Sequence, residues 1–223
     1  TIMKKLRHST RQTLACVVAT LVIFACIGVW SAAAAEPARA VVENLDSQLV
    51  TTMKQAEDLG FAGRYEKLAP TIDRSFDLDR IARLALGSEW DTLSAAQQKA
   101  YIAKFRQDTI ATYARRFDGY DGQTFEVTGA ADAAGGRRQV MTEIVGKDGK
   151  RTPINYVLAE ADGSWRIVNV VAGGVSDLAL KRGQYTTSIR NNGADGFLEQ
   201  FDQQPAGRAA AVLARGATVS NGD

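Results

Sequence analysis

Apolar side chains recur every three or four residues through the first half of the chain, which is the spacing of amphipathic helices. The pattern predicts four helices, over residues 37–60, 64–68, 77–87 and 94–117. Ser94 and Gln97 have the spacing of a capping box, so the longest helix is expected to begin there. Its apolar face runs through Tyr101, Phe105 and Tyr113 at intervals of four and eight residues.

After Gly122 the period of the apolar positions changes to two, which is the pattern of half-buried strands. Four strands are predicted, centred on residues 125–127, 140–144, 154–158 and 165–171. The segments between them contain Gly135-Gly136, a Gly-Lys-Asp-Gly turn at 146–149 and Asp162-Gly163, all typical of hairpins. Helices followed by an antiparallel meander predict an α+β domain, with the helices packed around a curved four-stranded sheet.

The last strand ends at Gly173-Gly174, and a basic amphipathic helix follows at once. Ser176 is expected to cap this helix, and Asn192-Gly193 to end it. A shorter helix is predicted from Asp195 onward. These C-terminal helices are expected to close the domain over the sheet.

The N-terminus has the features of a cleavable secretory signal peptide over residues 1–35. Four basic residues in the first eleven positions precede an uncharged apolar run, Leu14–Trp30, and small residues at 31–35 follow in A-x-A spacing. The sequence therefore predicts export to the periplasm, with cleavage after Ala35. Since the apolar run has 17 residues, an uncleaved membrane anchor is the alternative.

Removal of this leader changes the chemistry that is available to the mature chain. Both cysteines, Cys16 and Cys26, and the only histidine, His8, lie within it. A mature chain that starts at Glu36 therefore has no catalytic triad or dyad that uses His or Cys, and no zinc site built from these residues. Subtracting the four leader residues from 27 basic residues leaves 23 against 25 acidic ones, a charge balance that does not favour nucleic-acid binding.

The remaining sequence is long enough for one domain with a core, predicted over residues 36–204, and the segment 205–223 is predicted to be a disordered tail. The acidic residues form no calcium-loop pattern, and the glycine pairs lack the Lys and Ser/Thr of a phosphate loop. We expect no metal and no cofactor. The shared aromatic face of the long helix and the sheet fits either a filled core or the lining of an apolar cavity.

Two stretches, 76–90 (FDLDRIARLALGSEW) and 165–176 (WRIVNVVAGGVS), resemble the MlaC, or toluene-tolerance, family of periplasmic lipid-binding proteins. The resemblance covers roughly residues 37–203 and has the same order of elements. The segment 176–185 is more similar to the hopanoid-associated HpnM branch than to the phospholipid branch. Asn169 and Ala172 depart from the family pattern, in which an Asp is usual at the first position.

This resemblance implies a periplasmic carrier without enzymatic activity or metal. It is expected to hold a phospholipid or hopanoid in an apolar cavity and to exchange it with an ABC-transporter complex of the inner membrane, with transient membrane contact. The junction at Gly174 is expected to shape one cavity wall, and Lys181 and Arg182 to meet anionic head groups. The predicted lipid-binding residues are Leu84, Tyr101, Phe105, Tyr113, Phe125, Val127, Met141, Ile154, Tyr156, Leu158, Ile167, Val171, Gly174, Val175, Leu178 and Tyr185.

Two other functions remain open from the sequence. The same architecture resembles the NTF2-like superfamily of small isomerases and dehydratases, in which Tyr113 or Tyr156 would act beside Asp108 or Glu143. An adaptor that binds only protein partners would have the same core without a cavity. Lipid extracted with the purified protein would favour the carrier over both.

Overall fold

The computed structural model describes residues 35–203, so most of the predicted signal peptide and the whole predicted tail lie outside the described residues. Residues 38–203 belong to one compact unit, and residues 35–37 belong to a separate N-terminal unit. None of the described helices is both long and apolar enough to cross a membrane. The elements are α3 (Ala35–Lys54), α4 (Ala56–Ser75), α5 (Leu78–Leu86), the 3-10 helix η2 (Gly87–Thr92), α6 (Ala95–Arg116), β1 (Thr124–Ala133), β2 (Arg137–Val145), β3 (Arg151–Ala161), β4 (Ser164–Ala172), β5 (Val175–Ser176) and α7 (Asp177–Gln203).

The predicted boundaries of α5 and α6 are confirmed, because local side-chain caps define them. Asp77 accepts a hydrogen bond from the Arg80 backbone N–H at 3.0 Å, which satisfies one of the free donors of the first turn. Ser94 and Gln97 form the complete capping box at the start of α6. A cap at each start fixes where these helices begin relative to the sheet.

The predicted division of residues 37–68 into two helices is correct, but the predicted bounds are wrong. Helix α3 ends at Lys54, and α4 then continues through Pro70 to Ser75. Gly60 has φ of +56° and bends α4 rather than ending α3. The helix passes Pro70 because Leu68 and Ile72 on either side are both fully buried, so packing outweighs the lost backbone hydrogen bond.

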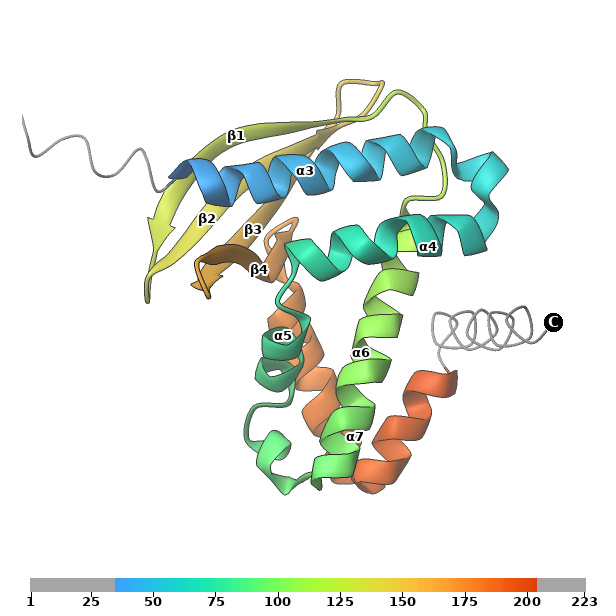
Figure 1. The fold of residues 1–223 in the computed structure, drawn as a ribbon, viewed down its shortest axis with the longest axis vertical. Helices are drawn as coiled ribbons and strands as arrows, with labels where there is room; N and C mark the ends of the chain where they lie inside the picture. The colour runs from blue at the N-terminus through green and yellow to red at the C-terminus, as the bar shows by residue number, and fades with distance from the viewer. Residues whose placement is uncertain (1–34, 204–223) are drawn as a thin grey trace, which may run out of the picture. The chain divides into compact units, whose positions relative to one another are not determined.

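The sheet is an antiparallel meander in the order β1-β2-β3-β4-β5, which confirms the predicted topology and adds a short fifth strand (Figure 1). Asp162 and Gly163 both have positive φ, as a type I′ turn between β3 and β4 requires. Strand β5 has only two residues, and it pairs with β4 through Val171↔Ser176 and Ala172↔Val175. Register shifts between β1 and β2 and between β3 and β4 mark irregularities of the kind that bend a sheet.

A single large core joins the helices to one face of this sheet. The α4–α5 corner is fixed to β4 because the Asp77 N–H donates to the Ile167 carbonyl at 3.0 Å. At another part of the core, Tyr101 of α6 packs against Tyr185, Phe197 and Phe201 of α7, with ring centroids 5.4–6.2 Å apart. These contacts hold α5, α6, α7 and β4 around a pocket.

Candidate functional site

A pocket of about 200 Å³ lies where α5, α6, β4 and the first turns of α7 meet. The residues that α5 and the sheet contribute to its wall are mainly apolar. The wall is more polar where α6 faces α7. The lining residues are Phe76, Leu78, Ile81, Phe105, Asp108, Thr109, Thr112, Tyr113, Arg116, Asn169, Val170, Ala172, Val175, Asp177, Leu178, Leu180 and Lys181.

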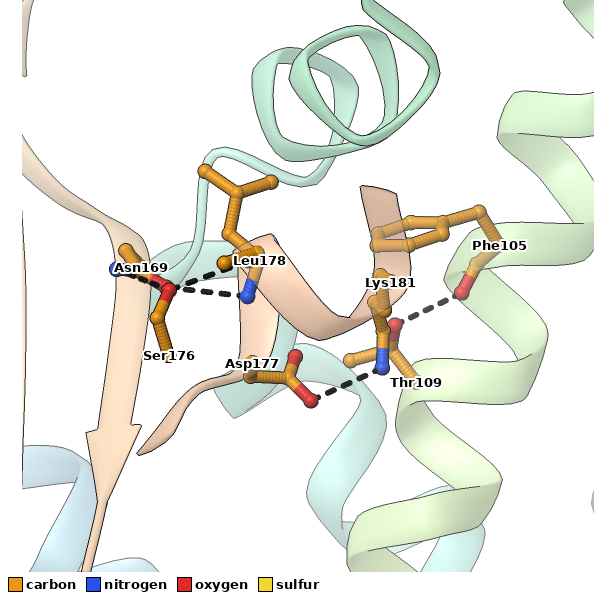
Figure 2. A network of polar contacts seen from close by, with 8 residues as sticks. Phe105, Thr109, Asn169, Ser176, Asp177, Leu178 and Lys181 are labelled. Atoms are coloured by element: carbon orange, nitrogen blue, oxygen red, sulfur yellow. Dashed lines mark hydrogen bonds and ion pairs between the residues drawn. The ribbon is translucent and has the colours of Figure 1, made fainter. Parts of the chain in front are cut away.

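Asn169 builds the wall at the junction between β4 and α7 (Figure 2). Its side-chain oxygen accepts hydrogen bonds from the Leu178 backbone N–H and from the Ser176 hydroxyl, both at 3.2 Å. The Ser176 hydroxyl in turn accepts from the Ala179 N–H at 3.2 Å, which confirms Ser176 as a cap of α7. Asn169, which departs from the family pattern, therefore satisfies a free backbone N–H at the start of α7.

Charged side chains surround the polar side of the pocket. Lys181 donates to Asp177 at 3.2 Å across one helical turn, and both residues line the pocket (Figure 2). Arg116 lines it from the end of α6, and no hydrogen bond or ion pair of its side chain is present within residues 35–203. Basic groups at the edge of an apolar pocket suit a ligand with an apolar body and an anionic end.

Asp108 is a buried carboxyl group in this pocket wall, with 8% of its surface exposed. Its Oδ1 atom has no hydrogen-bond partner among the described residues. Burial raises the pKa of Asp108, while attraction to Lys181 and Arg115 opposes that rise. The site thus contains an acceptor that is neither solvated nor paired.

Apolar side chains also mark the outer edge of the pocket. Val175 and Leu180 both line it and are 58% and 52% exposed. Val175 of β5 lies two residues before Asp177, and Leu180 directly precedes Lys181 in α7. Apolar and basic groups therefore share this edge.

Four predicted lipid-binding residues line the pocket: Phe105, Tyr113, Val175 and Leu178. Tyr101 and Tyr185 belong to the closely packed aromatic cluster of α6 and α7. Phe125 and Val127 line a different groove, between α3 and β1. The remaining predicted residues, none of which lines this pocket, are Leu84, Met141, Ile154, Tyr156, Leu158, Ile167, Val171 and Gly174.

Met141 and Val171 lie on the sheet face opposite the core. Both pair with Asn155, whereas the buried Tyr156 pairs with Val140 and Val170. The register shift between β3 and β4 places an extra residue in β4, so strict alternation fails after Ile167. Val170 consequently lines the pocket in the place predicted for Val171.

The expected close approach at Gly174 is absent. Gly174 has φ of +82°, but a side chain there would meet no atom within 4 Å. Arg182 does not line the pocket. Its guanidinium donates two hydrogen bonds to the Leu84 carbonyl, at 2.7 and 2.9 Å. Lys181 alone of the two predicted basic residues lines the pocket.

Neither Tyr113 nor Tyr156 forms a hydrogen bond to Asp108 or Glu143, the partners considered from the sequence. Tyr156 donates to Asp46 at 3.4 Å, and Glu143 binds Arg151 at 2.8 Å. Burial raises the pKa of Tyr113 and of Tyr156, which keeps both phenols protonated. No group of three potential metal-ligating residues occurs in the described part of the chain.

Sequence reasoning missed Leu78 and Ile81 of α5, and Thr112 and Arg116 of α6, as lining residues. Leu78 and Ile81 were not among the predicted lipid-binding residues, and Thr112 and Arg116 belong to no recognisable motif. Asp108 did have a signal, because it lies three residues after Phe105 and four before Thr112, on the face of α6 that packs inward. An acid at such a position is unusual for a core.

One family model matches most of the chain. The model of the family described as MlaC protein matches residues 43–203. The chain is similar to the toluene tolerance protein ttg2D of Pseudomonas putida, with 24% identity over 132 residues, which span 59% of this chain and 61% of the relative. It is also similar to the solved structure of a phospholipid-binding protein from Ralstonia solanacearum in complex with a phospholipid. That match has a TM-score of 0.67 and 20% identity, and it covers 79% of this chain and 98% of that chain.

Proposed function

Because the chain belongs to the MlaC family, we propose that it is a lipid carrier that holds an acyl chain in the pocket between α5, α6, β4 and α7. The observation that carries the proposal is the composition of this pocket. Apolar side chains such as Leu78, Ile81 and Leu178 line it, and Lys181 and Arg116 stand at its polar side. The likeness in fold to a phospholipid-binding protein supports a phospholipid as the ligand.

Burial of methylene groups supplies the affinity in this proposal. Each buried methylene contributes about 0.8 kcal/mol, so even a few carbons in the pocket give substantial binding without a specific polar contact. The pocket volume of about 200 Å³ is below the roughly 300–1,000 Å³ of typical ligand sites. A full acyl chain therefore requires the walls to separate.

We assign this separation to the junction between β4 and α7. Strand β5 is held by only two residue pairs, and Gly173 and Gly174 before it both have positive φ and open space around them. A junction with so few contacts moves at a lower cost than the packed aromatic cluster farther along α7. Movement of the first turn of α7 would widen the pocket beside Leu178 and Lys181.

The cellular role that fits this carrier is transfer of phospholipid through the periplasm, in exchange with an ABC-transporter complex of the inner membrane. The leader-like sequence before Glu36 supports export. The exposed apolar residues Val175 and Leu180, next to Lys181, support brief contact with an anionic membrane. A hopanoid ligand remains a prediction from residues 176–185.

Transfer between vesicles tests the proposal. Donor vesicles that contain a self-quenched fluorescent phospholipid are mixed with unlabelled acceptor vesicles, with and without the purified protein. We expect the protein to accelerate dequenching in proportion to its concentration. Equal rates with and without protein, at concentrations where the protein is folded, would reject a carrier function.

Neutralising the basic edge is expected to slow this transfer. A basic side chain close to an anionic surface contributes about 1 kcal/mol, so Arg116→Gln combined with Lys181→Gln should slow transfer from anionic vesicles about 30-fold at low salt. The difference should shrink above about 0.15 M salt, where the screening length falls to about 8 Å. The measurement is the vesicle assay as a function of salt concentration.

The matched control replaces two exposed basic residues at the hairpin ends of the sheet, with Arg137→Gln and Lys150→Gln. This variant has the same net charge as the double variant at the pocket. If both variants slow transfer equally, the effect comes from net charge and the basic edge has no specific role.

A further inference from the structure

Asp108, which lines the pocket, has a buried hydrogen-bond acceptor without a partner. It lies on the inward face of α6 and is more than nine-tenths buried, and its Oδ1 has no partner among the described residues. A buried polar atom without a partner is costly, and natural proteins keep few of them. A position that retains such a cost in the wall of a binding pocket suggests that the ligand supplies the missing partner.

Two donors near Asp108 in the pocket wall form hydrogen bonds to other groups. Lys181, whose charge acts on Asp108, donates to Asp177 at 3.2 Å (Figure 2). The Thr109 hydroxyl, next to Asp108 in the sequence, donates to the Phe105 carbonyl at 2.8 Å. Neither Lys181 nor Thr109 forms a hydrogen bond to Asp108, so its Oδ1 has no donor among the described residues.

We propose that Asp108 selects lipids whose polar head group carries N–H or O–H donors, over lipids whose head group has none. This inference rests on the proposed function, since it places the head of the same lipid at the polar side of the same pocket. When the pocket walls separate, the phosphate of such a lipid would face Arg116 and Lys181, and its donor group would reach the Asp108 carboxyl. A primary ammonium or a hydroxylated head meets this requirement, whereas a trimethylammonium head has no donor.

The test is a competition between two lipids with identical acyl chains, phosphatidylethanolamine and phosphatidylcholine. The full chain is incubated with vesicles that contain equal amounts of both, separated from them, and its bound lipids are quantified by mass spectrometry. Since a hydrogen bond to a charged group is among the stronger ones, we expect about a tenfold or greater excess of phosphatidylethanolamine.

Substitutions at Asp108 distinguish an effect on lipid selection from an effect on folding. Asp108→Leu removes the acceptor and should bring the ratio of the two lipids close to one. Asp108→Asn keeps an acceptor oxygen and should retain part of the preference. Asp91→Leu, the same exchange at an exposed position of η2, should retain all of it.

Thermal unfolding provides a second readout. Because Asp108→Leu removes a buried carboxyl group with an unmet oxygen, we expect its unfolding midpoint to rise, by about 2–4 °C. A structural role for Asp108 would lower the midpoint instead, and a lowered midpoint with loss of both lipids would overturn the proposal.

The outcomes also separate this inference from the function on which it rests. Equal binding of the two lipids by the wild type, or a preference that survives Asp108→Leu, would overturn selection by Asp108 and leave the carrier function standing. If the wild type bound neither lipid, the carrier function itself would fall, and selection with it.

Discussion

Thr112→Trp is expected to lower lipid affinity about 50-fold. Thr112 lines the pocket from α6 and is half-buried, and its side chain makes no hydrogen bond within residues 35–203. An indole at this position would occupy space that the acyl chain needs. Loss of room for about three methylene groups removes roughly 2.4 kcal/mol of binding free energy, which corresponds to about 50-fold in Kd. Titration with a fluorescent phospholipid measures this change.

The matched control is Thr187→Trp, the same exchange at an exposed position of α7 outside this pocket. We expect the control to bind lipid like the wild type, and both variants to unfold cooperatively. Wild-type affinity in folded Thr112→Trp would mean that the acyl chain lies elsewhere, and the groove between α3 and β1 would become the next candidate.

Asp46→Asn is expected to stabilise the protein strongly at pH 8 and hardly at all at pH 4. Asp46 is 5% exposed, its Oδ2 has no partner among the described residues, and Tyr156 donates to its Oδ1 at 3.4 Å. Burial raises the pKa of Asp46 from 3.8 to about 7, with a smaller contribution from Glu43. The charged form is therefore disfavoured in the folded protein.

The pH dependence of stability follows from proton binding by Asp46. Between about pH 4 and pH 7 the folded state keeps a proton on Asp46 that the unfolded state releases, so the wild type loses stability as the pH rises through this window. The loss is complete above pH 7 and amounts to at most about 4 kcal/mol. Asparagine has the same shape and no charge, so it should remove this loss.

Urea unfolding of both proteins from pH 4 to pH 8 measures the effect. The free energy of unfolding of Asp46→Asn should exceed that of the wild type by an amount that grows with pH. Asp58→Asn, at an exposed position of α4, serves as the control and should stay within about 0.5 kcal/mol of the wild type. A constant difference across the pH range would show that Asp46 does not take up a proton on folding.

Local signals explain which parts of the fold were predictable from the sequence. Caps such as Asp77 and Ser94 act within one turn, and the hairpin at Asp162-Gly163 needs only two residues with positive φ. The continuation of α4 through Pro70 was not predictable in this way, because it depends on burial of Leu68 and Ile72 against distant parts of the chain.

The pocket was harder to predict than the fold, because its wall is made where four elements meet. Large aromatic residues attracted attention in the sequence, yet Tyr101 and Tyr185 fill space among other rings instead of lining the pocket. Because of the register shift in β4, Val170 lines the pocket and Val171 does not. A prediction from strict alternation of apolar and polar positions does not include such a shift. Only the convergence of the elements in three dimensions brings α5 and Asp108 into the same wall.

Photo-crosslinking tests the central claim, that the acyl chain lies in this pocket, most directly. A phospholipid with a diazirine in its acyl chain is loaded onto the full-length protein, activated by light, and mapped by peptide mass spectrometry. We predict adducts on the pocket-lining segments of α5, α6 and the start of α7, with Ile81, Phe105 and Leu178 among the labelled residues, and a strong reduction in Thr112→Trp. Adducts confined to α3 and β1, or labelling unchanged by Thr112→Trp, would contradict the assignment of this pocket as the lipid site.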